Sequence, residues 1–339
     1  MFTPSATTFK LYSMVKHKKR RKRKTKNSSR SQPPASVTKK RPKWVLAPAA
    51  VVCVGIACFF LLKSWSGSDS SLLTQEEKIA VLKTEEMELA QQLLRDFPGN
   101  DATVSFVGSV YGQHGNNTEA VKFLNKALEL NPNRPDVYDA LGWVAFTKGA
   151  YEESITHWKK ALEIDAKLPG LRSSIAFSLM ALDRGSEAIE QLEKNIQIFP
   201  KSVYSHFLLG QAYLQQKDYE NAKKHYQIAI ELDQNYVNAY YGLFTACTRL
   251  KQQAKAREYM AVFKKLKAEE MKFQKARDGA YNDMVTMRQT VAENHIKAAQ
   301  IYRAQGQSDR AEELLEKAIK LDPGNVKYKQ FYQSIKNRK

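Results

Sequence analysis

The sequence predicts an all-α protein built from repeated pairs of helices. Small residues recur at intervals of 34 positions, and a large residue follows each of them four places later. The small positions are Ala120, Ser154, Ala188, Ala222 and Ala256, and the large ones are Leu124, Trp158, Leu192, Tyr226 and Met260. Beyond Ser66 the chain is rich in helix formers and shows no strand-like alternation. A 34-residue unit of two antiparallel helices, stacked on its neighbours into a superhelical solenoid, accounts for this pattern.

Residues 1–43 predict a basic, disordered tail. They hold 15 Lys or Arg and no Asp or Glu, so the remaining residues carry only +4 of the chain's net charge of +19. Lys and Arg gather on the cytoplasmic side of membranes, which places this tail in the cytoplasm. We expect it to contact anionic lipid headgroups. RNA contact and a nuclear signal are alternatives for KHKKRRKRK, but we do not expect nucleic-acid binding.

Residues 44–62 predict an uncleaved transmembrane helix. They are 19 residues without a charge, and a helix of that length reaches about 28 Å, close to the ~30 Å of a bilayer core. Trp44 and Trp65 stand at its ends, where indole rings favour the interface. A cleaved signal needs a small-residue exit, whereas Phe59-Phe60-Leu61-Leu62 is bulky. Residues 63–73 then form a linker to a domain outside the cytoplasm.

The rest of the chain divides into four segments. Residues 74–100 predict a capping helix or partial repeat, and residues 101–270 hold units one to five. Residues 271–291 are a charged helical insertion, because Ala256 and Ala311 are separated by 55 positions rather than 34. Residues 292–339 hold the last unit and a C-terminal helix. Pro132, Pro200 and Pro323 each follow a second helix, which proline cannot continue.

The units resemble the tetratricopeptide repeat family, as a membrane-anchored member. The second unit reads YDALGWVAFTKGAYEESITHWKKALEID and the fourth reads HFLLGQAYLQQKDYENAKKHYQIAIELDQ, with the family's Leu-Gly, Tyr, Ala and aromatic positions. The resemblance covers most of residues 101–325 and implies the fold. Asn195, Phe244 and Phe263 depart from it, because they replace small residues.

The sequence contains no motif for catalysis, a cofactor or a metal. It lacks phosphate-binding glycine loops, HExxH and the GxSxG elbow. His206 and His225 fall on different helices without metal-ligand spacing, and Cys247 is the lone cysteine of the repeats. We therefore expect a protein that is not an enzyme and binds no cofactor.

The resemblance implies that a concave groove binds a partner protein or peptide. In this fold, positions 2, 5, 9 and 12 of each first helix line that face. The residues so assigned are Asp139, Trp143, Phe146, Phe177, Met180, Tyr204, Phe207, Gln211 and Tyr241. Aromatic residues recur among them, and an exposed apolar strip of this size marks a binding surface. The alternative is that individual members pack into the core between units.

We expect a non-catalytic, membrane-tethered scaffold that binds its partner through this groove and assists assembly of an envelope complex. Two alternatives stay open. The chain could be a regulatory subunit of a membrane-associated enzyme, or its repeats could face the cytosol as an import or chaperone adaptor. The fold itself does not choose between them, because unrelated proteins use the same scaffold.

Overall fold

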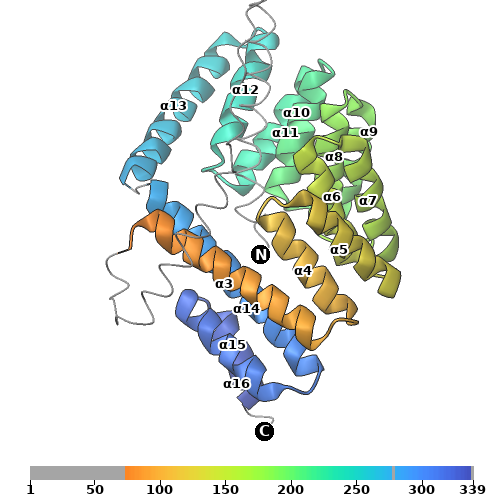
Figure 1. The fold of residues 1–339 in the computed structure, drawn as a ribbon. Helices are drawn as coiled ribbons and strands as arrows, with labels where there is room; N and C mark the ends of the chain where they lie inside the picture. Colours follow the sequence, from red (N-terminus) through yellow and green to blue (C-terminus); the bar gives the residue numbers. More distant parts are fainter. Residues whose placement is uncertain (1–72, 277–278, 337–339) are drawn as a thin grey trace, which may run out of the picture. The chain divides into compact units, whose positions relative to one another are not determined.

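The computed structural model describes residues 73–276 and 279–336, which are helical without strands (Figure 1). The bounds are α3 (Gln75–Asp96), α4 (Asp101–Gln113), α5 (Asn117–Leu130), α6 (Pro135–Lys148), α7 (Tyr151–Ile164), α8 (Leu171–Ala181) and α9 (Gly185–Ile198). They continue with α10 (Val203–Gln215), α11 (Tyr219–Leu232), α12 (Val237–Arg249), α13 (Gln253–Ala276), α14 (Gly279–Ala304), α15 (Ser308–Leu321) and α16 (Val326–Lys336). Helices α4 to α13 make five antiparallel pairs in sequence order, which confirms the predicted all-α solenoid.

In units one, two and four, a glycine of the first helix packs against a large side chain of the second helix. A Cβ built on Gly142 would lie 2.4 Å from Nε1 of Trp158, and one on Gly108 would lie 2.9 Å from Cγ of Leu124. Tyr226 fills two such spaces, because Cβ atoms on Gly210 and Gly242 would lie 2.6 and 2.5 Å from its ring. Trp158 and Tyr226 are buried. Large residues at three of the predicted positions, Leu124, Trp158 and Tyr226, therefore fill the space that glycine leaves on a facing helix.

The turn inside each of the first five pairs uses one residue with left-handed backbone. These residues keep the 34-residue period: Gly115, Gly149, Asp183, Lys217 and Lys251, with φ between 60° and 79°. Only the first two are glycine, so the other three adopt a conformation that L side chains disfavour. The backbone geometry of the turn is therefore the same in all five units although the residue type is not.

Asn195 occupies a position that is alanine in units one, two and four, and it is buried. Its side-chain Nδ2 donates a hydrogen bond to Oγ of Ser205 at 2.7 Å. Ser205 also contacts Oγ of Ser173 at 3.1 Å, across to the preceding first helix. The buried amide nitrogen of Asn195 is therefore satisfied by one serine hydroxyl, whereas its Oδ1 is buried without a hydrogen-bond partner among the described residues.

The last pair of helices packs on the beginning of the array. Helices α14 and α15 share a core with α3 and α4, in which Leu93, Phe106, Ala298 and Leu315 are buried. The ring of Tyr302 meets that of Phe97 at 5.3 Å, and its hydroxyl donates to Asp96 Oδ2 at 2.6 Å. The predicted capping segment, residues 74–100, contains α3, which lies at this end of the array beside α14 (Figure 1). The sixth unit packs at the same end.

A buried polar junction fixes this arrangement. Glu86 of α3 is fully buried, and its carboxylate accepts hydrogen bonds from Nε2 of His114, at 2.6 Å, and from Nδ2 of Asn294 on α14. Asn294 also donates to Oε1 of Gln113 at 2.7 Å. Residues 208 positions apart in the sequence thus satisfy one buried carboxylate, whose desolvation would otherwise be costly.

The segment 271–291 does not form a separate helix. Residues 271–276 are the last turns of α13, and residues 279–291 begin α14. Among the described residues, no helix combines the length and the apolar character that crossing a membrane requires. The predicted tail, transmembrane segment 44–62 and linker lie outside the described residues, apart from Leu73 at the end of the linker.

Gly242→Ala should lower the free energy of unfolding by about 1–3 kcal/mol, because the new methyl group overlaps the buried ring of Tyr226. Gly112→Ala is the matched control: it is also helical, and its Cβ would meet its neighbours at an ordinary 3.6 Å. The control should be neutral or stabilising, since alanine has the higher helix propensity. Urea unfolding measures both. Equal effects would contradict the packing argument.

Asn294→Asp should release the last helix pair from the start of the array. The change removes two donated hydrogen bonds and sets a second carboxylate against buried Glu86, at a cost of about 3 kcal/mol or more. Hydrogen exchange should quicken in α15 and remain slow in α9 to α11. Asn235→Asp, at an exposed position, is the control. Uniform loss of protection along the whole array would show that the junction is not a local contact.

Candidate partner-binding surface

The repeat brings the predicted groove residues into rows along successive first helices. Asp139, Phe207 and Tyr241 are equivalent residues of α6, α10 and α12, separated by multiples of 34 positions. Trp143, Phe177 and Gln211 form a second row, on α6, α8 and α10. A row arises because each first helix repeats the orientation of the one before it.

Asp139 is the charged member of these rows. Its Oδ1 accepts a hydrogen bond from Nε1 of Trp158 at 2.9 Å. The pKa of Asp139 is raised to about 6, chiefly by burial. Hydrogen bonds from Trp158 and Trp143 lower this pKa, and the nearby charge of Asp136 raises it. The carboxylate therefore titrates closer to neutrality than an exposed aspartate, and a cationic group beside it would be strongly favoured.

Aromatic rings surround this carboxylate. Trp143 meets Trp158 edge-on, with ring centroids 5.3 Å apart, and meets Phe146 at 5.5 Å. Phe146 in turn contacts Phe177 of the next first helix at 5.7 Å. Trp143 and Phe177 are half-buried, so each shows part of its ring to solvent. Aromatic contacts of this kind contribute about 0.5–1.5 kcal/mol each beyond area burial and hold the rings in place.

Two of the predicted groove residues belong to the core. Phe146 is 7% exposed and Phe207 is 4% exposed. Phe207 packs against Tyr236, at 5.2 Å, and against Tyr226. Their assignment as open groove residues is corrected here, because the neighbouring helices cover them. Phe146 and Phe207 belong to the core cluster on which the half-buried apolar groove residues pack.

The remaining predicted residues of α6, α8 and α10 are half-buried. We call them the aromatic surface, which consists of Asp139, Trp143, Phe177, Met180, Tyr204 and Gln211. Trp143, Phe177, Met180 and Tyr204 all pack on the same core cluster. Tyr241, by contrast, is 50% exposed and lies at the end of the array on α12. It is therefore treated separately from the aromatic surface.

His206 and His225 come together although the sequence shows no ligand spacing for them. Their Nδ1 atoms are 3.2 Å apart, and the ring of Tyr213 stacks on His225 at 5.5 Å. Burial lowers the pKa of His225 to about 4, and His206 and Lys224 add to the effect. Within the described part of the chain, no group of three His, Cys, Asp or Glu side chains is arranged to hold a metal.

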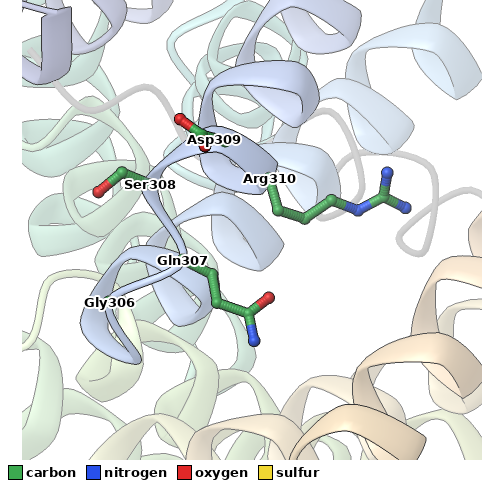
Figure 2. Close-up of a pocket in the computed structure, with 5 residues that line it drawn as sticks. All are labelled: Gly306, Gln307, Ser308, Asp309 and Arg310. Atoms are coloured by element: carbon green, nitrogen blue, oxygen red, sulfur yellow. The ribbon is translucent and has the colours of Figure 1, made fainter.

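An open hollow of about 360 Å³ lies elsewhere, in the turn between α14 and α15. It is lined by Gly306, Gln307, Ser308, Asp309 and Arg310 (Figure 2). These are consecutive residues of one turn, and Figure 2 shows their side chains pointing in different directions. The hollow brings no chemical groups together and does not define a site.

Family comparison identifies tetratricopeptide repeats in the chain. Models of the tetratricopeptide repeat match residues 106–134, 135–168, 203–236 and 292–325. The first three segments correspond to units one, two and four, and the last to α14 and α15. The chain therefore contains tetratricopeptide repeats, a scaffold that mediates protein–protein interaction and binds protein or peptide partners.

Two curated proteins are similar over part of this region. The chain is 30% identical over 127 residues, 38% of its length, to anaphase-promoting complex subunit 3 of Schizosaccharomyces pombe. It is 33% identical over 84 residues, 24% of its length, to small glutamine-rich tetratricopeptide repeat-containing protein 2 of Mycosarcoma maydis. The matches span only 19% and 24% of those two proteins, so they describe repeats rather than whole proteins.

Among solved structures, a similar fold occurs in the C-terminal part of a tetratricopeptide repeat-containing protein from Cytophaga hutchinsonii. The TM-score is 0.51 at 17% identity, covering 76% of this chain and 97% of that one. At this identity the likeness concerns the fold alone. The partner of the present chain must therefore be inferred from the residues on its own surface.

Asp139→Asn should change the pH dependence of stability. The folded pKa of about 6 exceeds the ordinary value of 3.8, so the native protein loses stability relative to the unfolded chain as pH rises through this window. The variant should be about 1–3 kcal/mol more stable than wild type at pH 7 and nearly equal to it at pH 4. Chemical unfolding at each pH measures the difference.

His225 acts in the opposite direction over an overlapping window, but both proteins contain it and its contribution cancels. Asp165→Asn, at an exposed site, is the control and should leave the pH profile unchanged. Parallel stability curves for wild type and Asp139→Asn would show that the Asp139 carboxyl is not held in a desolvated setting.

Proposed function

We propose that this chain is a non-catalytic scaffold whose aromatic surface binds a segment of a partner protein. The observation that carries the proposal is the carboxylate of Asp139, set among half-buried aromatic rings on successive first helices. Burial disfavours the charged form of Asp139 and raises its pKa. Packing alone would therefore not favour a carboxylate at this position.

The chemistry of the surface points to a partner segment with a basic side chain flanked by apolar ones. A Lys or Arg placed beside Asp139 would form an ion pair and recover part of the desolvation cost. The same cation would lie near the face of Trp143, where an aromatic ring attracts positive charge. Met180, Phe177 and Tyr204 offer adaptable apolar contacts along the neighbouring helices.

The wider setting rests on the sequence. Residues 44–62 would anchor the chain as a single span, with residues 1–43 in the cytoplasm and in contact with anionic headgroups. The repeats would then work outside the cytoplasm, in assembly of an envelope complex. Protease added to spheroplasts with an intact plasma membrane should cleave the repeats in this orientation, and protection of the repeats would favour the cytosol-facing alternative.

Photo-crosslinking on the intact chain tests the binding surface. A photoreactive residue replaces Phe177, and a matched probe replaces exposed Lys159 on the second helix α7. We expect a discrete crosslinked protein from position 177 that is absent from position 159. Mass spectrometry then identifies the crosslinked segment, which should contain Lys or Arg.

The same crosslink repeated in Asp139→Asn separates binding from packing. The variant should be at least as stable as wild type, and its crosslink should fall roughly tenfold, since a bound cation would lose its counter-charge. Equal, diffuse labelling from both probe positions would refute the proposal. An unchanged discrete crosslink in the variant would refute the role of Asp139 and leave apolar contact as the basis of binding.

A further inference from the structure

Among the described residues, no helix pair follows α12 and α13 at the far end of the array. In four earlier units the residues equivalent to Met260 are Leu124, Trp158, Leu192 and Tyr226, and all are 1% exposed or less. In the earlier units a following first helix lies on this face: α8 packs on α7, α10 on α9 and α12 on α11. Helix α13 packs mainly on α12, because the next pair lies at the start of the array. Met260 is accordingly only half-buried.

Apolar and aromatic side chains gather on this uncovered end. Tyr241 is 50% exposed, and its ring contacts those of Phe244, at 5.9 Å, and Phe263, at 5.3 Å. Phe244, Phe263 and Leu266 are half-buried. We call this the end surface: Tyr241, Phe244, Met260, Phe263 and Leu266. The end surface shares no residue with the aromatic surface.

The two phenylalanines are not the residues that a further repeat would require. Phe244 is equivalent to Gly210, and Phe263 is equivalent to Ala229. Those small residues are fully buried in unit four, where the helices approach closely. Phenylalanine rings at both positions prevent the close helix approach that the small residues allow within the array. The end surface is therefore suited to an added helix that does not belong to a repeat.

Basic side chains outnumber acidic ones beside the end surface, where Glu258 and Glu269 are also exposed. Lys264 and Lys265 are exposed on α13, next to Phe263 and Leu266, and neither forms an ion pair with a described residue. Lys255 and Arg257, about two turns or more earlier, are likewise exposed and without an ion-pair partner among the described residues. Lys267, in contrast, pairs with Glu270 at 2.5 Å. Four cations along one helix thus remain available to an acidic partner.

We propose that the end surface binds an amphipathic α-helix of another protein that is apolar on one face and acidic along its edges. The apolar face would cover Tyr241 and Phe263, whose equivalents in unit four, Phe207 and Ala229, are buried. Its carboxylates would pair with Lys264 and Lys265. Charge argues against two other occupants: a second copy would oppose these lysines with the same lysines, and residues 1–43 contain no acidic residue.

Fluorescence anisotropy with designed peptides on the full chain tests this proposal. The probe is a 20-residue helical peptide with Leu or Phe at i, i+3, i+4 and i+7 repeats and Glu at flanking positions; the comparison peptide carries Lys in place of Glu. Lys264→Glu/Lys265→Glu should weaken binding of the acidic peptide at least tenfold and strengthen binding of the basic one. Lys159→Glu/Lys160→Glu, an exposed pair on α7, is the matched control of equal net charge.

The expected result is binding of the acidic peptide to wild type and to the α7 control, and loss of binding in the α13 variant. Phe263→Ser should weaken binding of both peptides, with circular dichroism confirming that the helices remain. The proposal is overturned by equal losses in the two charge variants, which would indicate unspecific attraction, or by no binding of the acidic peptide. Concentration-dependent dimerisation through Phe263, seen by sedimentation, would also overturn it in favour of a second copy.

Discussion

Close contact between a large side chain and glycine is the constraint on which the array depends. Tyr226 lies between Gly210 of its own unit and Gly242 of the next, so one buried ring sets the distance between two helix pairs at once. Trp158 packs on Gly142 of its own unit and also donates the hydrogen bond that orients Asp139. The packing that defines the repeat thereby positions the one buried charge of the aromatic surface.

The position of the sixth unit has the largest consequence for the surfaces of the molecule. Because α14 and α15 pack on α3 and α4, the first end of the array is covered by the last repeat in the sequence. The polar contacts of Glu86, His114 and Asn294 specify this pairing, since a buried carboxylate tolerates few alternative partners. The opposite end, formed by α12 and α13, is left without a following unit. An exposed aromatic cluster at that end is the direct result.

Aromatic residues occur both in the aromatic surface and in the core, and packing by neighbouring helices determines which of them are buried. Phe146 and Met180 occupy the same position in neighbouring units, yet Phe146 is closed off by Tyr151, Trp158 and Phe177 while Met180 is half-buried. The difference follows from the local size of the packing partners. It explains why a position within a repeat indicates a face of the helix but does not determine exposure.

The sequence by itself determined the helical pairs, their 34-residue period and the small and large positions at each crossing, because these depend on contacts within a unit and with its immediate neighbours. It also indicated Asp139 and Trp143 as surface candidates. It did not determine that Phe146 and Phe207 are buried, nor that Glu86 meets Asn294 across 208 positions. Only the tertiary structure decided these points. Burial within the array depends on the side chains of neighbouring helices, and the Glu86–Asn294 contact depends on where the last unit packs. A periodic sequence leaves that choice open, and here long-range polar and apolar contacts made it.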